Sequence, residues 1–206
     1  MAEITTLFWD MGGVILTNAW DRAARKLAAE KFHLEVDDIE DRNDLMLHAF
    51  ETGQASLEEY LNRVIFYCPR PFTREEFKAF MYSQSKPHAE TLAVLGSAAA
   101  TRKYLLASLN NESLELNLYR IEKFHLRNFF SVFLSSCYLG VRKPDSRIYR
   151  LALRITQRDP GECAFIDDRP LNLECARDLG MQTIHYVSPG QLKQDFLNRG
   201  VDLDGR

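Results

Sequence analysis

Four short polar segments of the sequence carry side chain types that could act together on a phosphoryl group. They are Asp10-Met11-Gly12-Gly13, Ser108-Leu109-Asn110-Asn111, Gly140-Val141-Arg142-Lys143-Pro144 and Asp167-Asp168. Each follows or adjoins a short apolar run, which is typical of a strand buried in a sheet. Taken singly, each has an ordinary structural explanation, such as a turn or a helix cap. Their occurrence together, each beside a predicted strand, favours a catalytic site.

The chemistry of these side chains indicates a metal-assisted reaction at phosphorus. Three converging carboxylates (Asp10, Asp167 and Asp168) would repel one another and raise one another's pKa values. A hard divalent cation removes that conflict, and Mg²⁺ favours a few carboxylates together with water and phosphate oxygens. Lys143 and Ser108 would hold the peripheral oxygens of the phosphoryl group. Asp10 itself could attack phosphorus and form an aspartyl-phosphate.

Five apolar runs predict the strands that position these segments. The runs occupy residues 4–9, 103–108, 132–135, 164–166 and 182–187. Helical periodicity fills residues 111–124, 145–156 and 169–179 between them, so we expect an α/β fold with a doubly wound, Rossmann-like parallel sheet. Ligands of such sheets bind outside the carboxyl ends of the strands, where the polar segments are expected to meet.

A long segment after the first strand breaks this alternation and predicts a helical insertion. Residues from about 19 to 85 hold four helical patterns, at 21–32, 38–50, 57–67 and 74–82. Capping-box sequences at Ser56–Glu59 and Thr73–Glu76 mark the starts of the last two. The predicted organisation is an α/β core of residues 1–17 and 87–206, with a four-helix insertion at residues 18–86.

Composition limits the possible partners and location. The 206 residues are 46% hydrophobic and carry a net charge of −3, with lysine and arginine spread along the chain. We therefore expect no nucleic acid partner and no membrane partner, and no apolar run approaches the roughly 20 residues of a membrane span. The four cysteines form no C-x-x-C pair, Cys163 and Cys175 are expected to be buried, and no signal peptide is apparent. A cytoplasmic location is predicted.

The four segments resemble the four motifs of the haloacid dehalogenase-like (HAD) hydrolase superfamily, most of whose members are phosphatases. The stretches that carry the resemblance are FWDMGGVILTN, LLASLNN, GVRKPDSRIY and FIDDRPLNLECARDLGM, in motif order. The resemblance implies a HAD-like core with a helical cap domain, here residues 18–86. It is greatest to the subgroup of sugar-phosphate phosphatases such as glucose-1-phosphate phosphatase, and of the N-terminal phosphatase domain of soluble epoxide hydrolase.

The resemblance also implies a role for each motif residue. Asp10 is the expected nucleophile and a Mg²⁺ ligand, and Gly12 gives its carbonyl to the metal. Asp168 is the expected direct metal ligand, and Asp167 acts directly or through water. The residues expected beside the phosphoryl group are Gly12, Gly13, Ser108, Asn110 and Lys143. Ser108 and Lys143 share the catalytic role with Asp10, and Asn172 stands where the family often has an asparagine near the metal.

Gly12 departs from the usual family pattern. Most relatives have a second aspartate there, which protonates the leaving group and then activates the hydrolytic water. A general acid is typically worth about 10²–10⁴ in rate. The chain could use substrates with good leaving groups, or an acid from the substrate or the cap. The cap is expected to choose the substrate, and its residues Trp20, Arg22, His48 and Glu51 could face the site.

Two other functions remain open at this stage. Without the second aspartate the protein could be a slow or non-catalytic binder of phosphorylated ligands. The metal-independent 2-haloacid dehalogenases of the superfamily also lack it, but their fourth motif usually has serine and asparagine where this chain has Asp167 and Asp168. The function that the sequence favours is a Mg²⁺-dependent phosphatase of a small phosphorylated metabolite, such as a sugar phosphate.

Overall fold

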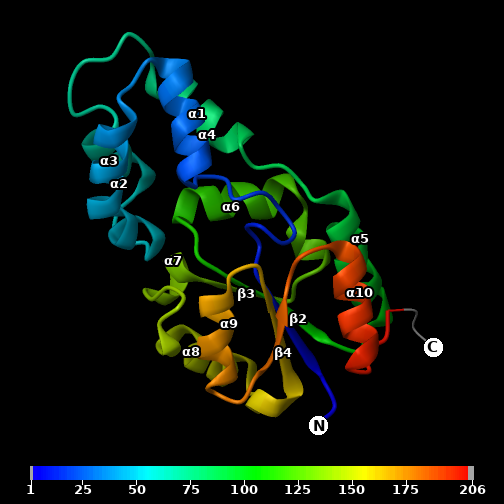
Figure 1. Cartoon of the computed structure of the whole chain (residues 1–206). Helices are drawn as coiled ribbons and strands as arrows, with labels where there is room; N and C mark the ends of the chain where they lie inside the picture. The colour runs from blue at the N-terminus through cyan, green and yellow to red at the C-terminus, as the bar shows by residue number, and fades with distance from the viewer. Residues whose placement is uncertain (1, 204–206) are drawn as a thin grey trace.

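A five-stranded parallel sheet forms the centre of the computed structural model, which describes residues 2–203 (Figure 1). The strands are β1 (Thr6–Trp9), β2 (Leu105–Asn110), β3 (Val132–Ser135), β4 (Cys163–Asp167) and β5 (Gln182–His185). Their order is β3-β2-β1-β4-β5, and every neighbouring pair is parallel. The predicted α/β fold class is therefore confirmed. Because β1 is central, the residue that follows it, Asp10, lies in the middle of the sheet edge.

Helices cover both faces of this sheet, which explains why the strands read as continuous apolar runs. Trp9 faces α5 (Ala89–Thr101) and α10 (Pro189–Asn198), and its ring meets Phe196 with centroids 5.6 Å apart. The next strand residue toward the N-terminus, Phe8, points the other way. It packs with residues of α8 (Ser146–Thr156) and α9 (Pro170–Arg177).

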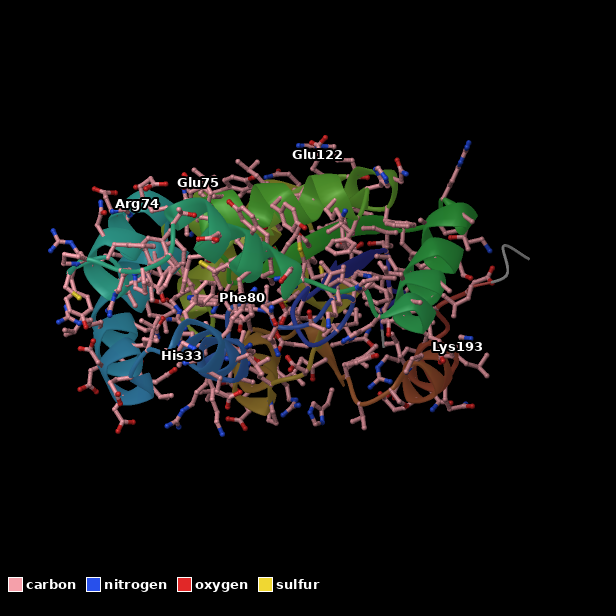
Figure 2. All side chains as sticks on the ribbon, turned by 90° about the horizontal axis from the view of Figure 1, so that it is seen from above. His33, Arg74, Glu75, Phe80, Glu122 and Lys193 are labelled. Carbon is pink, nitrogen blue, oxygen red and sulfur yellow. The ribbon has the colours of Figure 1, made fainter. Side chains whose placement is uncertain are left out.

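The predicted insertion is a layer of four helices with a hydrophobic core of its own. The helices are α1 (Arg22–Phe32), α2 (Val36–Glu51), α3 (Leu57–Val64) and α4 (Arg74–Ser83). Seen from above, His33, Arg74, Glu75 and Phe80 lie in one half of the molecule, and Lys193 of α10 lies in the other (Figure 2). Both predicted capping boxes are formed, at Ser56 and Thr73.

The insertion leaves and rejoins the core at one place, above α6 (Leu114–Lys123). The Thr17 amide donates to the Lys86 carbonyl over 2.9 Å, and Leu16 forms a bridge with Pro87. Leu116 of α6 belongs to the core of the insertion, whereas Ile121 belongs to the core of the sheet. Helix α6 therefore joins the two layers.

The structure differs from the sequence prediction in three respects. Strand β2 runs two residues beyond Ser108, to Asn110. Helices α5, α7 (Ser136–Leu139) and α10 were not predicted. Cys163 is buried as predicted, but Cys175 is only half-buried. Among residues 2–203 no helix has the length and apolar character that crossing a membrane requires. The ends of the predicted core, residue 1 and residues 204–206, lie outside the described part.

Candidate functional site

The first motif and the fourth motif meet because β1 and β4 are neighbours. The Asp10 amide donates to the Ile166 carbonyl over 2.9 Å, which sets Asp10 beside Asp167 at the end of β4. Lys143 reaches both carboxylates: its Nζ lies 2.9 Å from Asp10 Oδ1 and 2.6 Å from Asp167 Oδ2. Lys143 is 2% exposed and Asp167 is fully buried. A buried lysine thus joins two of the predicted catalytic segments.

One lysine does not balance the negative charge of this cluster. Asp10, Asp167 and Asp168 each offer a carboxylate oxygen within 4.8 Å of the others. Burial, reinforced by Asp167 and Asp168, raises the pKa of Asp10 to about 7 in spite of the Lys143 charge. Burial opposes the charged form of Lys143, but Asp10 and Asp167 outweigh it and raise the lysine pKa. A cluster made only of oxygen donors, with excess negative charge, fits a hard divalent cation such as Mg²⁺.

Asp167 and Asp168 differ in how much of their hydrogen-bonding capacity the protein uses. Asp167 accepts from the Arg169 amide at 2.8 Å and from Asn172 Nδ2 at 3.0 and 3.1 Å, besides its contact with Lys143. Asp168 Oδ1 is buried without a hydrogen-bond partner. Burial also raises the pKa of Asp168. Asp168 therefore has the oxygen that most needs a further ligand, and Asn172 acts by orienting Asp167.

The turn after Asp10 requires glycine for a steric reason. Gly13 has φ +75°, and a Cβ there would overlap the carboxylate of Asp168. The space beside Gly12 is occupied by another residue, because a Cβ added at Gly12 would lie 2.5 Å from Asn18 Oδ1. The Met11 amide of the same turn donates to Asp10 Oδ1 over 2.8 Å. Together with Lys143 this occupies Oδ1, and no described residue donates a hydrogen bond to Oδ2.

The second motif is arranged differently from the prediction. Ser108 lies inside β2, on the face that it shares with Leu106. Its buried hydroxyl has no hydrogen-bond partner among the described residues. Ser108 is also absent from the lining of the cavity over Asp10 that is described below. Asn110, the last residue of β2, is also buried, and its side chain bonds to Asn117 and Ser135 at 3.2 and 3.0 Å. These internal partners satisfy the polar Asn110 side chain, so the strand continues past Ser108.

Asn111, the next residue, is a site residue that the sequence did not single out. Its Oδ1 accepts from the Lys143 amide at 2.8 Å, and its Nδ2 donates to the Lys143 carbonyl at 2.9 Å. The two bonds fix the backbone of Lys143 to the end of β2. Asn111 stands three residues after the predicted end of the strand at Ser108, and only its place in the polar segment that follows this strand could have pointed to it.

A cavity of about 220 Å³ lies over Asp10, between the core and the insertion. Its lining includes Asp10, Gly12 and Lys143 from the predicted site. Trp20, Arg22 and Glu51 contribute from the insertion, whereas the exposed His48 does not reach it.

The wall of the cavity is rich in arginine. Arg25 is held by Glu40 at 2.8 Å, and Arg120 by Glu112 at 2.6 Å. Arg142 lies 2.9 Å from Glu51. Two more arginines of the lining, Arg22 and Arg169, are exposed. The cavity is therefore suited to an anionic ligand.

Comparison with known proteins supports this description. A family model described as haloacid dehalogenase-like hydrolase matches residues 4–180. A flavin mononucleotide hydrolase of Arabidopsis thaliana is 28% identical over 165 residues, which cover 80% of this chain and 66% of that protein. A D-ribitol-5-phosphate phosphatase of Bacteroides thetaiotaomicron is 24% identical over 203 residues, with coverage of 94% and 97%. The match spans only 35% of a longer mammalian relative.

A solved structure shares the fold. It is a HAD family enzyme of Bacteroides thetaiotaomicron in complex with magnesium and inorganic phosphate. The TM-score is 0.73 at 21% identity, with 88% of this chain and 93% of that chain covered. At this identity the likeness establishes the arrangement of the elements and nothing more.

Proposed function

The chain belongs to the haloacid dehalogenase-like hydrolase family, and we propose that it is a magnesium-dependent phosphatase of a small phosphorylated metabolite, such as a sugar phosphate. The observation that carries the proposal is the meeting of Asp10, Lys143, Asp167 and Asp168 at one sheet edge, beside an arginine-rich cavity. The flavin mononucleotide hydrolase and the ribitol phosphate phosphatase among its relatives support a phosphate ester as substrate.

In the proposed reaction Asp10 is the nucleophile. Its Oδ1 is held by the Met11 amide and by Lys143, which leaves Oδ2 to attack phosphorus. The attack gives an aspartyl-phosphate on Asp10, and water then hydrolyses it. Lys143 compensates the charge of the carboxylate and of the phosphoryl oxygens, and Asn111 keeps the lysine in place.

Asp10, Asp168 and the carbonyl of Gly12 are the groups proposed to hold Mg²⁺, with Asp167 acting directly or through water. The unpartnered Asp168 oxygen and the raised pKa of Asp10, caused mainly by burial, support this set. When bound, the cation would compensate the negative charge of the three carboxylates and of the phosphoryl group.

Residues 18–86 are proposed to be the cap that selects the substrate. They contribute Trp20, Arg22 and Glu51 to the cavity, so the insertion and the core enclose the ligand together. The free thiols of the four cysteines suit the proposed cytoplasmic location.

Hydrolysis assays with and without Mg²⁺ test the proposed function. We expect the protein to release phosphate from p-nitrophenyl phosphate and from a panel of sugar phosphates, to stop when EDTA removes the metal, and to lose activity in Asp10→Asn. Binding of phosphorylated ligands without turnover would instead establish a non-catalytic relative. Chloride release from 2-chloropropionate without metal would establish a dehalogenase, in which Asp167 and Asp168 would be costly uncompensated charges.

A further inference from the structure

The immediate neighbourhood of the nucleophile has no carboxyl group at position 12 to move protons. Gly12 has no side chain, and Asn18 fills the space beside it. An asparagine amide does not titrate and can neither protonate a leaving group nor activate water. A phosphatase built on Asp10 therefore needs its acid from another wall of the cavity.

The other carboxylates that line the cavity are those of Asp21, Glu51 and Glu112. Asp21 caps α1 by accepting from the Ala24 amide at 2.9 Å. Glu112 accepts from Arg120 at 2.6 Å and from the Ser113 amide at 3.0 Å. Glu51 Oε2 lies 2.9 Å from Arg142 Nε in an ion pair, without the geometry of a hydrogen bond. Unlike Asp21 and Glu112, Glu51 accepts no hydrogen bond from a backbone amide of the described residues.

Glu51 is also bonded directly to the core through its backbone. It is the last residue of α2, and its carbonyl accepts from Ser136 Oγ over 2.6 Å. Two residues later, Gly53 has φ +72° and lies so close to the Cys137 carbonyl that a Cβ would overlap it. The end of α2 thus rests on α7, and the Glu51 side chain lines the cavity together with Asp10.

We propose that Glu51 is the general acid and base of the reaction, and takes over from the cap the role that position 12 cannot perform. This inference rests on the proposed phosphatase function. It makes Glu51 a catalytic residue that contacts the oxygen of the leaving group.

The proton balance of the two half-reactions is complete with this single group. In the first, an Asp10 oxygen bonds to phosphorus, the bond from phosphorus to the ester oxygen breaks, and the Glu51 carboxyl gives its proton to that oxygen, releasing an alcohol. In the second, the Glu51 carboxylate takes a proton from water as the water oxygen bonds to phosphorus. The Asp10–phosphorus bond breaks, phosphate leaves, and Glu51 is again protonated.

The surroundings of Glu51 favour a proton that is exchanged near neutral pH. Burial raises its pKa to about 7, while Arg142, Arg169 and Lys143 lower it and Glu112 raises it. A group with such a pKa is well matched to both giving and taking a proton.

The closing experiment compares Glu51→Gln with the parent on two substrates in the presence of Mg²⁺. The leaving group of a simple alkyl phosphate needs a proton on its oxygen. The leaving group of p-nitrophenyl phosphate departs as the p-nitrophenolate ion and needs none. We expect kcat/KM for the alkyl ester to fall about 10²–10⁴-fold in Glu51→Gln, and the burst of p-nitrophenol to be preserved within about tenfold. The decline of parent alkyl kcat/KM above pH 7 should disappear in the variant. An equal loss on both substrates, or no loss on either, overturns the inference.

Arg142→Gln is the matched control. It breaks the same ion pair and keeps the carboxyl group, so the ratio of alkyl to aryl kcat/KM should stay within about tenfold of the parent. If Glu51 served only to hold the cap, the two variants would change that ratio alike. Thermal unfolding of both variants checks that they are folded, and Glu51→Asp, which keeps a carboxyl, should recover part of the alkyl activity. A parent that hydrolyses neither ester would overturn the proposed function, which is a separate outcome.

Discussion

Asn18 fills the space that a side chain at position 12 would enter, because a Cβ on Gly12 would lie 2.5 Å from Asn18 Oδ1. The contact is with the end of a flexible side chain, and Gly12 has an ordinary negative φ. Gly12→Asp is therefore sterically possible once Asn18 rotates. Asn18 is therefore the residue that would have to move if a carboxyl group were introduced at position 12.

Gly12→Asp should rescue the Glu51→Gln variant. It restores a carboxyl group next to Asp10, so we expect alkyl phosphate hydrolysis to rise at least tenfold over Glu51→Gln alone, and further when Asn18→Ala makes room. Steady-state kinetics on alkyl and aryl esters measure the effect. Gly12→Asn is the matched control, since it has the same size without a titratable group. Equal rates for the two substitutions would show that no acid was restored.

Gly13→Ala should remove metal-dependent activity. Its Cβ would displace the Asp168 carboxylate, so we expect at least a hundredfold loss and a higher Mg²⁺ concentration for half-maximal rate. Gly140→Ala provides the control, because Gly140 also has a positive φ, +67°, but nothing lies within 4 Å of a Cβ there. Both should lose about 1 kcal/mol of stability from backbone strain, while only Gly13→Ala loses its response to Mg²⁺. Parallel losses of activity would contradict this explanation.

Asp167→Asn should mainly lower the free energy of unfolding, whereas Asp168→Asn should mainly weaken Mg²⁺ binding. Asp167 is bonded to Lys143, Asn172 and a backbone amide, so its substitution should lower the free energy of unfolding by about 3–5 kcal/mol. Asp168 makes fewer internal bonds, so its substitution should mainly weaken Mg²⁺ binding. Urea denaturation and calorimetric titration with Mg²⁺ distinguish the two. A larger stability loss in Asp168→Asn would refute the assignment.

Asp10 should make the metal-free protein less stable as pH rises. Its pKa is raised, mainly by burial, from 3.8 to about 7 in the folded state. The folded state then binds more protons than the unfolded state between these values, and its stability falls as pH increases through about 7. In EDTA, the stability of Asp10→Asn minus that of the parent should grow by a few kcal/mol between pH 4 and pH 8. A pH-independent difference by urea denaturation would rule this out.

The sequence predicts the framework well where local signals are strong. All five strands were located. The central strands β1 and β4 are fully buried apolar runs, whereas the edge strands β3 and β5 are only partly buried. The helices α5 and α10 were not located. The sequence of α5, AETLAVLGSAAAT, consists mainly of small and apolar residues, so it offers little contrast between a buried and an exposed side.

The site shows where local information ends. The predicted strand ended at Ser108, because the apolar run at residues 103–108 stops at this polar residue. The real boundary is Asn110, whose amide is satisfied by Asn117 and Ser135, seven and 25 residues away. Likewise, Asn18 reaches position 12 through a chain reversal that no periodic pattern encodes. Contacts of this kind depend on tertiary structure and become visible only in three dimensions.

Arg142 and Lys143 are consecutive residues that face different parts of the molecule, Glu51 in the helical layer and Asp10 in the sheet. Both residues stand on the loop between α7 and α8, so this one loop contacts the end of α2 and also the proposed nucleophile. The proposed substrate-selecting layer and the proposed nucleophile are thus contacted by two consecutive residues, Arg142 and Lys143. We expect a phosphate ester that does not fit the helical layer to be hydrolysed slowly, because the same loop contributes to both contacts.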